Sequence, residues 1–319
     1  MRIAYIECFS GISGDMTVGA LLHAGVSEDL LHKTVAALKI GAELRIRRID
    51  RSGISATKVD VLVDGKIADR VDESGHVHTH EHRHTHTHDH THSHTHHHGH
   101  THSHLQGHDH PKHDAVNHRE TRSLSTIKNI IRKAEIAVPA QEMAVRAFEL
   151  LGEAEARVHN VPIESIHFHE VGAVDTIVDI VCASVGCHAL GVDRFICSPL
   201  NVGGGTVNCA HGEFPVPAPA TLALLKGVPV YSSGIQSELV TPTGAALVRA
   251  LNCSFSAFPS MNVEFTGYGA GSREFAGRPS VVRISVGELC TSAGILSHTE
   301  SQVEPAVLRQ IPGTTLQVV

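Results

Sequence analysis

A run of alternating histidines interrupts the chain and limits what its middle part can fold into. Every even-numbered position from His76 to His104 is histidine, and most odd-numbered positions between them are threonine or serine. Such a segment has too little apolar surface to offset the entropy lost on ordering. We therefore expect residues 67–120 to be a disordered insert that divides a globular core into residues 1–66 and 121–288.

Imidazole chemistry suggests a function for this tract, which we take as residues 76–118. Neutral imidazole binds nickel, copper, zinc and iron, and alternation in an extended chain would place the rings along one edge. We predict transition-metal binding through many overlapping sites; a pH-responsive linker is the alternative. Histidine alone does not select the metal, because copper binds a given site more tightly than nickel or zinc. The predicted tract ligands are His76, His78, His80, His82, His84, His86, His88, His90, His92, His94, His96, His98, His100, His102 and His104.

Composition excludes several classes of protein. A net charge of −7 argues against nucleic-acid binding, which would require a basic face. No apolar run approaches the roughly 20 residues of a membrane span. Seven cysteines without a C-x-x-C pair suggest reduced thiols in a cytoplasmic protein, and the first residues resemble a strand and loop rather than a signal peptide. With 41% hydrophobic but only 4% aromatic residues, the core must be aliphatic.

Apolar periodicity outside the insert predicts strands interleaved with helices. We expect an α/β or α+β fold, with a mixed sheet and flanking helices. The segment 267–271 predicts a flexible turn, and residues 289–319 a loosely structured tail. Predicted helices cover 16–24, 28–38, 141–159, 175–190, 220–226 and 241–251; predicted strands cover 3–9, 43–50, 54–63, 166–170, 192–197, 261–267 and 280–287.

Two predicted helix starts carry residues suited to an anion. Backbone N–H groups at a helix start attract phosphate, and glycines allow close approach. Asp15 is either a cap or, with Glu7, a metal ligand or acid–base group, whereas Cys8 is expected to be a buried thiol. Capping by Thr241 is the alternative at the second start. The predicted cofactor-binding residues are Ser10, Gly11, Ser13, Gly14, Thr241, Thr243 and Gly244.

A second group of polar residues follows the predicted strand at 166–170. Alternation places His167 and His169 on one face, and Glu170 follows directly. Asp175 and Asp179 lie four residues apart and therefore share a helical face. These residues form either a metal or acid–base cluster or a structural set of pairs.

Taken together, these motifs resemble the LarC family of nickel-insertion proteins. The resemblance covers about residues 1–288. It rests on the His-rich insert and on ECFSGISGDM at 7–16, EAEARVH at 153–159, HFHEVGAVDTIVDIV at 167–181, HGEFPVPAPAT at 211–221, ELVTPTGAA at 238–246 and Arg278-Pro279.

The resemblance implies insertion of Ni²⁺ into a sulfur-bearing pyridinium mononucleotide. The product would be the nickel-pincer cofactor of an acceptor apoenzyme of the lactate racemase type. The tract would collect nickel, and a folded site would pass it to the substrate. We expect that site to include the catalytic candidates His167, His169, Glu170, Glu7 and Asp15, with Asp175, Asp179 and His211 as further metal ligands.

Two departures from the family pattern matter. Glu7 stands where the family usually has aspartate, which retains the carboxylate. Full-length relatives continue into a domain that binds CTP with Mg²⁺ or Mn²⁺, announced by an acidic stretch that we do not find after Glu288. We therefore do not expect nucleotide-dependent catalysis from this chain alone. A non-enzymatic nickel store and a metal-supplying subunit of a two-chain chelatase remain alternatives, and a homo-oligomer is compatible with the sequence.

Overall fold

The computed structural model describes residues 1–68, 122–168, 173–209 and 212–290, with the backbone alone of His167. The histidine tract, His169, Glu170, His211 and the tail from residue 291 lie outside the described residues. Met1–Ala68 and the described residues from Arg122 onward contribute to one compact unit. The core of this unit therefore joins residues from both sides of the tract.

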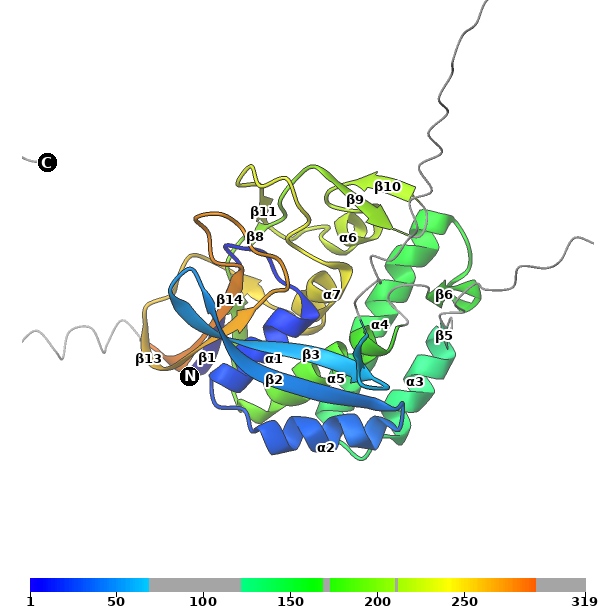
Figure 1. The fold of residues 1–319 in the computed structure, drawn as a ribbon, viewed down its shortest axis with the longest axis horizontal. Coiled ribbons are helices and arrows are strands. Elements are labelled where there is room, and N and C mark those ends of the chain that lie inside the picture. The colour runs from blue at the N-terminus through cyan, green and yellow to red at the C-terminus, as the bar shows by residue number, and fades with distance from the viewer. Residues whose placement is uncertain (69–121, 169–172, 210–211, 291–319) are drawn as a thin grey trace, which may run out of the picture. The chain divides into compact units, whose positions relative to one another are not determined.

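A mixed sheet organises this unit (Figure 1), so the predicted fold class is confirmed. Strand β1 (Arg2–Glu7) pairs in parallel with β7 and antiparallel with β14. Strands β2 and β3 form the predicted hairpin, where Ser52 (φ 54°) and Gly53 (φ 84°) both adopt left-handed backbone conformations. The sheet order is β12 (Ser254–Phe255), β7 (Arg194–Cys197), β1, β14 (Val281–Leu289), β13 (Met261–Ala270), β3 (Ile54–Val63) and β2 (Ala42–Arg51), with β4 (Lys66–Ile67) on β3.

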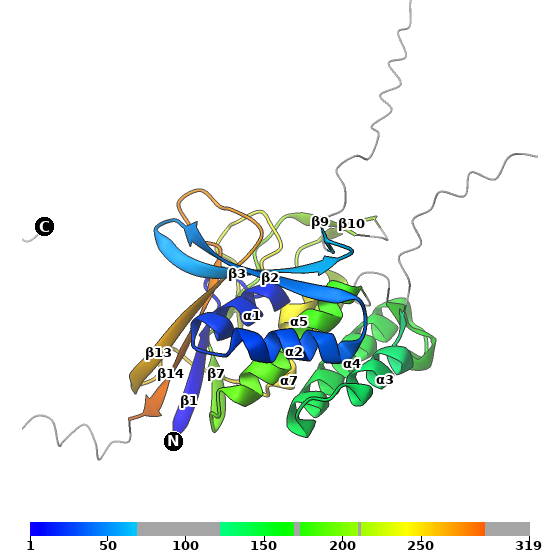
Figure 2. The same cartoon turned by 60° about the horizontal axis from the view of Figure 1, so that its bottom comes forward.

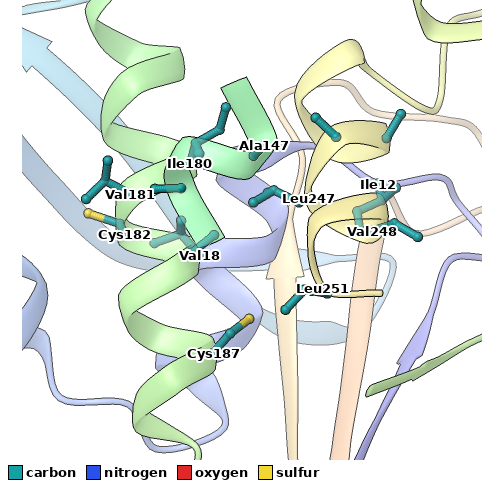
Figure 3. Close-up of a cluster of buried hydrophobic side chains, with 14 of the residues drawn as sticks. Ile12, Val18, Ala147, Ile180, Val181, Cys182, Cys187, Leu247, Val248 and Leu251 are labelled. Carbon is teal, nitrogen blue, oxygen red and sulfur yellow. The ribbon is translucent and has the colours of Figure 1, made fainter. Parts of the chain in front are cut away.

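Helices pack against one face of this sheet and under the hairpin, as Figure 2 shows. The aliphatic core forms where α1, α4, α5 and α7 meet; Ile12, Val18, Ile180 and Leu247 are at most 1% exposed (Figure 3). Burial of such side chains is the main stabilising contribution to the fold. The helices are α1 (Gly14–His23), α2 (Glu28–Leu38), α3 (Leu124–Lys133), α4 (Val138–His159), α5 (Val174–Ala189), α6 (Pro219–Leu224) and α7 (Pro242–Ala250), with one 3₁₀ turn at Ile163–Ser165.

In the part of the chain that the structure describes, three short strand pairs are separate from the main sheet. Strands β5 (Arg122–Ser123) and β6 (His167–Phe168) are antiparallel, and Ser123 is opposite His167. Strands β8 (Leu200–Asn201) and β11 (Val230–Tyr231) are parallel, whereas β9 (Thr206–Cys209) and β10 (Gly212–Pro215) are antiparallel. None of the described helices is long and apolar enough to cross a membrane.

The predicted turn at residues 267–271 is wrong, because Gly267 and Gly269 lie inside β13. These two glycines allow a helix to pack closely on the strand and do not reverse the chain. A Cβ atom at Gly269 would lie 1.7 Å from the carbonyl oxygen of Met16, and one at Gly267 would lie 2.1 Å from that of Ala20. The two glycines therefore let the backbone of α1 approach the strand directly. Helix α3 was not predicted.

Candidate functional site

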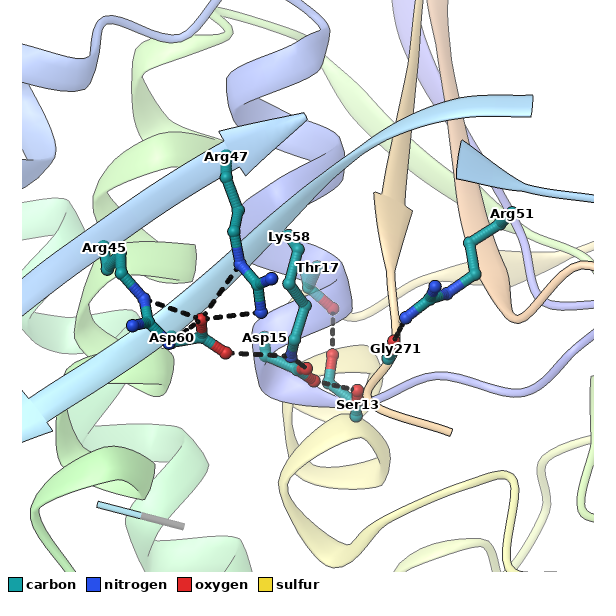
Figure 4. Close-up of polar contacts among 9 residues, drawn as sticks. All are labelled: Ser13, Asp15, Thr17, Arg45, Arg47, Arg51, Lys58, Asp60 and Gly271. Carbon is teal, nitrogen blue, oxygen red and sulfur yellow. Dashed lines mark hydrogen bonds and ion pairs between the residues drawn. The ribbon is translucent and has the colours of Figure 1, made fainter. Parts of the chain in front are cut away.

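The hairpin presents a group of charged side chains to the start of α1, and we name it the hairpin charge cluster (Figure 4). The Lys58 side chain is 5% exposed, and its ammonium group forms an ion pair with Asp15 and lies 3.9 Å from Asp60 Oδ1. Arg45 Nη2 and Arg47 Nη2 donate to Asp60 Oδ2 at 2.9 and 3.0 Å. Three cations thus surround two carboxylates. The five members are Asp15, Arg45, Arg47, Lys58 and Asp60.

Strand geometry explains how the hairpin assembles this cluster. Arg45 is opposite Asp60 and Arg47 is opposite Lys58 in the antiparallel register, so all four side chains share one face. Burial raises the pKa of Asp60, but the hydrogen bond from Arg45 and the charges of Lys58 and Arg47 outweigh it, and the net pKa is lowered. Asp60 is therefore ionised at neutral pH.

Asp15 lies in the first turn of α1, where a carboxylate is favourable, but Ser13 is the residue at the cap position. Asp15 accepts a hydrogen bond from the Ser13 hydroxyl as well as from Lys58. The next carboxylate, Asp179 of α5, is close to this turn, because a Cβ atom at Gly14 would lie 2.5 Å from Asp179 Oδ2. The first turn of α1, which includes Asp15, therefore lies against α5 at Asp179, and these two carboxylates are both predicted members of the folded site.

Asp175 and Asp179 share one face of α5, as predicted. Both are partly exposed, whereas Thr176, Ile177 and Val178 between them are buried. Glu7 is the last residue of β1 and pairs with Arg283 from the neighbouring strand β14. Among the described residues, Glu7 pairs with Arg283 whereas Asp15 pairs with Lys58, so the two carboxylates contact different cations. Their shared metal or acid–base role stays a prediction.

Two of the predicted anion-binding glycines lie at close backbone crossings. Gly11 has φ +80°, and a Cβ atom there would lie 1.9 Å from the carbonyl oxygen of Leu239. A Cβ atom at Gly244 would lie 2.2 Å from the carbonyl oxygen of Ile12. These contacts dock the loop after β1 against the chain that enters α7. Packing accounts for both glycines, and anion binding by them stays a prediction.

The remaining residues of these two helix starts have identified partners or positions. Thr241 Oγ1 accepts a hydrogen bond from Gly244 N at 3.1 Å, so the capping alternative is confirmed. Ser10 Oγ donates to the carbonyl oxygen of Pro279 at 2.7 Å. Thr243 is partly exposed in the first turn of α7. The first helix start is thus linked to both the entry of α7 and the loop before β14.

Among the described residues, no three His, Cys, Asp or Glu side chains converge on one metal-sized position. Of the predicted folded site, His169, Glu170 and His211 lie outside those residues. The predicted burial of Cys8 is confirmed, and its sulfur is 3.7 Å from that of Cys197. The hydrogen bond with Cys8 and burial raise the pKa of Cys197, and burial raises that of Cys187 to about 12. Cys187 and Cys197 are therefore protonated at neutral pH and poorly suited to bind nickel as thiolates.

Sequence reasoning missed the hairpin half of the charge cluster and a buried amide, Asn201. Lys58 and Asp60 alternate with valines in strand β3, and two charges on one face of a largely buried strand indicate a paired site. Asn201 is 0% exposed and is the last residue of the short strand β8. A single asparagine carries no comparable pattern, so only the structure identifies it.

A family model described as nickel insertion protein matches residues 4–310. The pyridinium-3,5-bisthiocarboxylic acid mononucleotide nickel insertion protein of Geobacillus kaustophilus is 37% identical over 99% of this chain and 68% of its own length. The protein of the same name from Desulfitobacterium hafniense (strain DSM 10664 / DCB-2) is 40% identical over 91% of this chain and 59% of its own length. The chain thus spans about three fifths to two thirds of these relatives. No solved structure matches.

Proposed function

Because this chain belongs to the family of nickel insertion proteins, we propose that it inserts Ni²⁺ into pyridinium-3,5-bisthiocarboxylic acid mononucleotide. The product would be the nickel-pincer cofactor of lactate racemase-type enzymes. In this role the chain acts as a nickel chelatase, with the metal ion and the mononucleotide as its two substrates. The histidine tract supplies the ion, and the folded core holds the acceptor.

The observation that carries this proposal is the strand pair that follows the tract. Arg122 is opposite Phe168 and Ser123 is opposite His167. The last histidine of the tract, His118, precedes Arg122 by only four residues in the sequence. The proposed reservoir therefore leads, in sequence, directly into the strand that pairs with the HFHE motif.

Donor chemistry gives the transfer its direction. We assign the transfer site to His167, His169 and Glu170, with Asp175, Asp179 and His211 as further ligands. Imidazole and carboxylate donors hold nickel less tightly than sulfur donors, so the two thiocarboxylates of the substrate can displace them. The protein's contribution is to orient the substrate and to remove part of the water from the metal. No covalent bond between protein and substrate is needed.

Nickel insertion in vitro tests the two parts separately. In one variant, every tract histidine from 76 to 118 becomes serine, which keeps the length of the insert. We expect normal insertion with excess Ni²⁺ and a large loss when Ni²⁺ is limiting. In a second variant, His167→Ala with His169→Ala, we expect insertion to fall at any Ni²⁺ concentration.

Exposed His188, near the other end of α5, provides a matched control, and His188→Ala should retain full activity. If the variant with both His167 and His169 replaced inserts nickel as well as wild type, the transfer site is wrongly assigned. If the serine tract abolishes insertion even with excess Ni²⁺, the tract is more than a reservoir.

Part of the relatives' length has no counterpart in this chain, so the assay is run with and without the remaining C-terminal portion of a relative. Activity with the chain alone supports the proposal in full. Activity only in the mixture makes this chain the metal-supplying subunit of a two-chain chelatase. Nickel binding without insertion in either setting would leave a nickel store.

A further inference from the structure

One buried amide forms hydrogen bonds with three loops at the edge of the sheet where the parallel strands β1 and β7 have their carboxyl ends. Asn201 Nδ2 donates to the carbonyl oxygen of Phe9 at 2.7 Å and to Ser233 Oγ at 2.8 Å. Its Oδ1 accepts from Ser233 N at 3.2 Å and from Gly203 N at 3.3 Å. Both donors and both acceptor positions of the amide are therefore used. The loops after β1, β8 and β11 are fixed relative to one another.

These loops lie where ligands bind in α/β sheets. Strands β1 and β7 are parallel, and Phe9 and Asn201 follow their carboxyl ends. Ligand sites in open α/β sheets form outside the carboxyl ends of parallel strands. The loop before β14 also reaches this edge, since Ser10 donates to the carbonyl oxygen of Pro279.

The loop before β14 brings two guanidinium groups to this edge. Arg278 Nη1 donates to Ser233 Oγ at 2.5 Å. Arg273 Nη1 donates to Ser237 Oγ at 2.7 Å and to the carbonyl oxygen of Glu238 at 2.9 Å. Over the described ranges neither arginine forms an ion pair with a carboxylate, and the adjacent Glu274 pairs with Arg51 at 2.6 Å. Among the described residues, hydroxyl and carbonyl oxygens rather than carboxylates hold these two guanidinium groups in place.

Ser233 adds a donor to these charges. Its hydroxyl oxygen accepts from both Asn201 and Arg278, so its own proton remains to be donated. Segment 232–237 is exposed or partly exposed, so a ligand can reach it. Arg278 contacts this hydroxyl, and Arg273 of the same loop contacts Ser237 and Glu238 of the segment that follows it. Two fixed guanidinium groups and a hydroxyl donor on neighbouring loops suit an anion with several acceptor oxygens, because arginine binds such groups in a bidentate way.

We propose that Arg273, Arg278 and Ser233 form the subsite for the phosphate monoester of the mononucleotide substrate. The inference rests on the proposed function for the identity of the ligand. It places the phosphate in the loops around Asn201 rather than at the helix starts of α1 and α7. The pyridinium ring and its sulfurs would then extend from this edge toward the transferred metal.

Binding of a stable pyridine mononucleotide tests the subsite without nickel. Nicotinic acid mononucleotide and its riboside, which lacks the phosphate, are titrated calorimetrically into the full chain. We expect Arg278→Gln and Arg273→Gln each to weaken mononucleotide binding about 10- to 100-fold, the range for a lost charge-assisted hydrogen bond. Riboside binding should not change, and Arg278→Lys should weaken binding less than Arg278→Gln.

Arg194→Gln is the matched control, because Arg194 is an exposed arginine at the opposite end of β7. It should bind both ligands like wild type, and thermal unfolding verifies that each variant is folded. Wild-type mononucleotide affinity in the doubly substituted chain would overturn the subsite, as would equal losses for mononucleotide and riboside. If insertion proceeds but the double variant keeps the wild-type KM for the mononucleotide, only the subsite fails. If phosphate-dependent binding requires both arginines but no nickel is inserted, only the proposed function fails.

Discussion

The hairpin charge cluster and the loops around Asn201 both hold arginines, but they use them differently. In the cluster, Arg45 and Arg47 donate to the carboxylate of Asp60, which is only 6% exposed. Around Asn201, Arg273 and Arg278 donate to hydroxyl and carbonyl oxygens. The first region pairs its arginines with a carboxylate, whereas the second leaves positive charge for a ligand.

This difference separates the tasks of the two regions. A cluster whose cations are paired with buried or partly buried carboxylates fixes the hairpin on α1 and prefers its present partners to an incoming ion. A fixed but uncompensated pair of cations gains most when an anion arrives, because the donors are already oriented. We therefore expect substitutions in the cluster to act on stability, and substitutions at the two arginines to act on binding.

The largest expected effect on stability comes from Lys58→Met. The change leaves Asp15 and Asp60 without the buried ammonium that contacts the first and approaches the second. Removing one partner of a buried ion pair costs about 3–5 kcal/mol. Urea unfolding of the full chain measures the free energy of unfolding, and mononucleotide affinity measured on the remaining folded protein should stay near the wild-type value.

Lys128→Met serves as the control, because the Lys128–Glu149 pair is on the surface, with 23% and 31% of the side chains exposed. Its loss should cost less than about 1 kcal/mol. Adding Asp15→Asn to Lys58→Met should recover part of the stability. Equal costs for Lys58→Met and Lys128→Met would show that the cluster is not structural.

Asn201→Ala is expected to have the next largest effect. It leaves the carbonyl oxygen of Phe9 and the N–H groups of Gly203 and Ser233 without their partner, at a cost of about 2–3 kcal/mol. Unlike Lys58→Met, it should also weaken mononucleotide binding, because Ser233 and Arg278 lose their fixed positions. Both losses are measurable on one preparation, by urea unfolding and calorimetry.

Exposed Asn208 in β9 provides the control for Asn201→Ala. Asn208→Ala should change stability by less than about 0.5 kcal/mol. Normal mononucleotide affinity in a destabilised Asn201→Ala chain would mean that the amide stabilises the loops without positioning the arginines. The distinction between the two regions would then be weaker than we propose.

Lowering the pH should change the stability of the two regions differently, by a smaller amount than the two substitutions above. The pKa of Asp60 is lowered from its usual 3.8, so its ionised form stabilises the folded state above that pH. This contribution is lost as pH falls through the folded-state pKa. Below about pH 4, wild type should therefore lose stability relative to Asp60→Asn. The cost of Asn201→Ala should stay constant over the same range, since an amide does not titrate.

Local sequence patterns predicted much of the fold. Alternation and the Ser52-Gly53 turn predicted the hairpin, and helix α2 has the predicted bounds, Glu28–Leu38. Segment 267–271 misled us, because glycines suggest a turn when only local sequence is considered. Their actual role depends on α1, which is distant in sequence and packs directly on them. Such close approaches between elements leave no local signal.

The candidate site was less predictable for the same reason. Asp15, Asp175 and Asp179 were identified from their spacing around helix starts, which is a local property. Their neighbours Lys58 and Asp60 come from a hairpin whose position against α1 is set by core packing. The loops around Asn201 meet because β1 and β7 are parallel neighbours, and strand order could not be derived from the sequence.

The smallest expected effect concerns His23, at the opposite end of α1 from Asp15. Burial lowers the pKa of His23, the charge of Arg48 adds to this shift, and a hydrogen bond with the backbone of Tyr268 opposes it. Because the folded state disfavours the protonated ring, wild type should lose stability as pH falls below about 6.5. His23→Gln should remove this dependence and cost about 1 kcal/mol or less at pH 8, where the ring accepts from Tyr268 N at 3.1 Å.

His188→Gln, which removes an exposed histidine, should change stability by less than about 0.5 kcal/mol. An acid loss near pH 6 that persists in His23→Gln would place the responsible group elsewhere. If the loss of stability near pH 6 disappears in His23→Gln, His23 is the responsible group. Its titration is then distinct from that of Asp60 in the hairpin charge cluster, which occurs at lower pH.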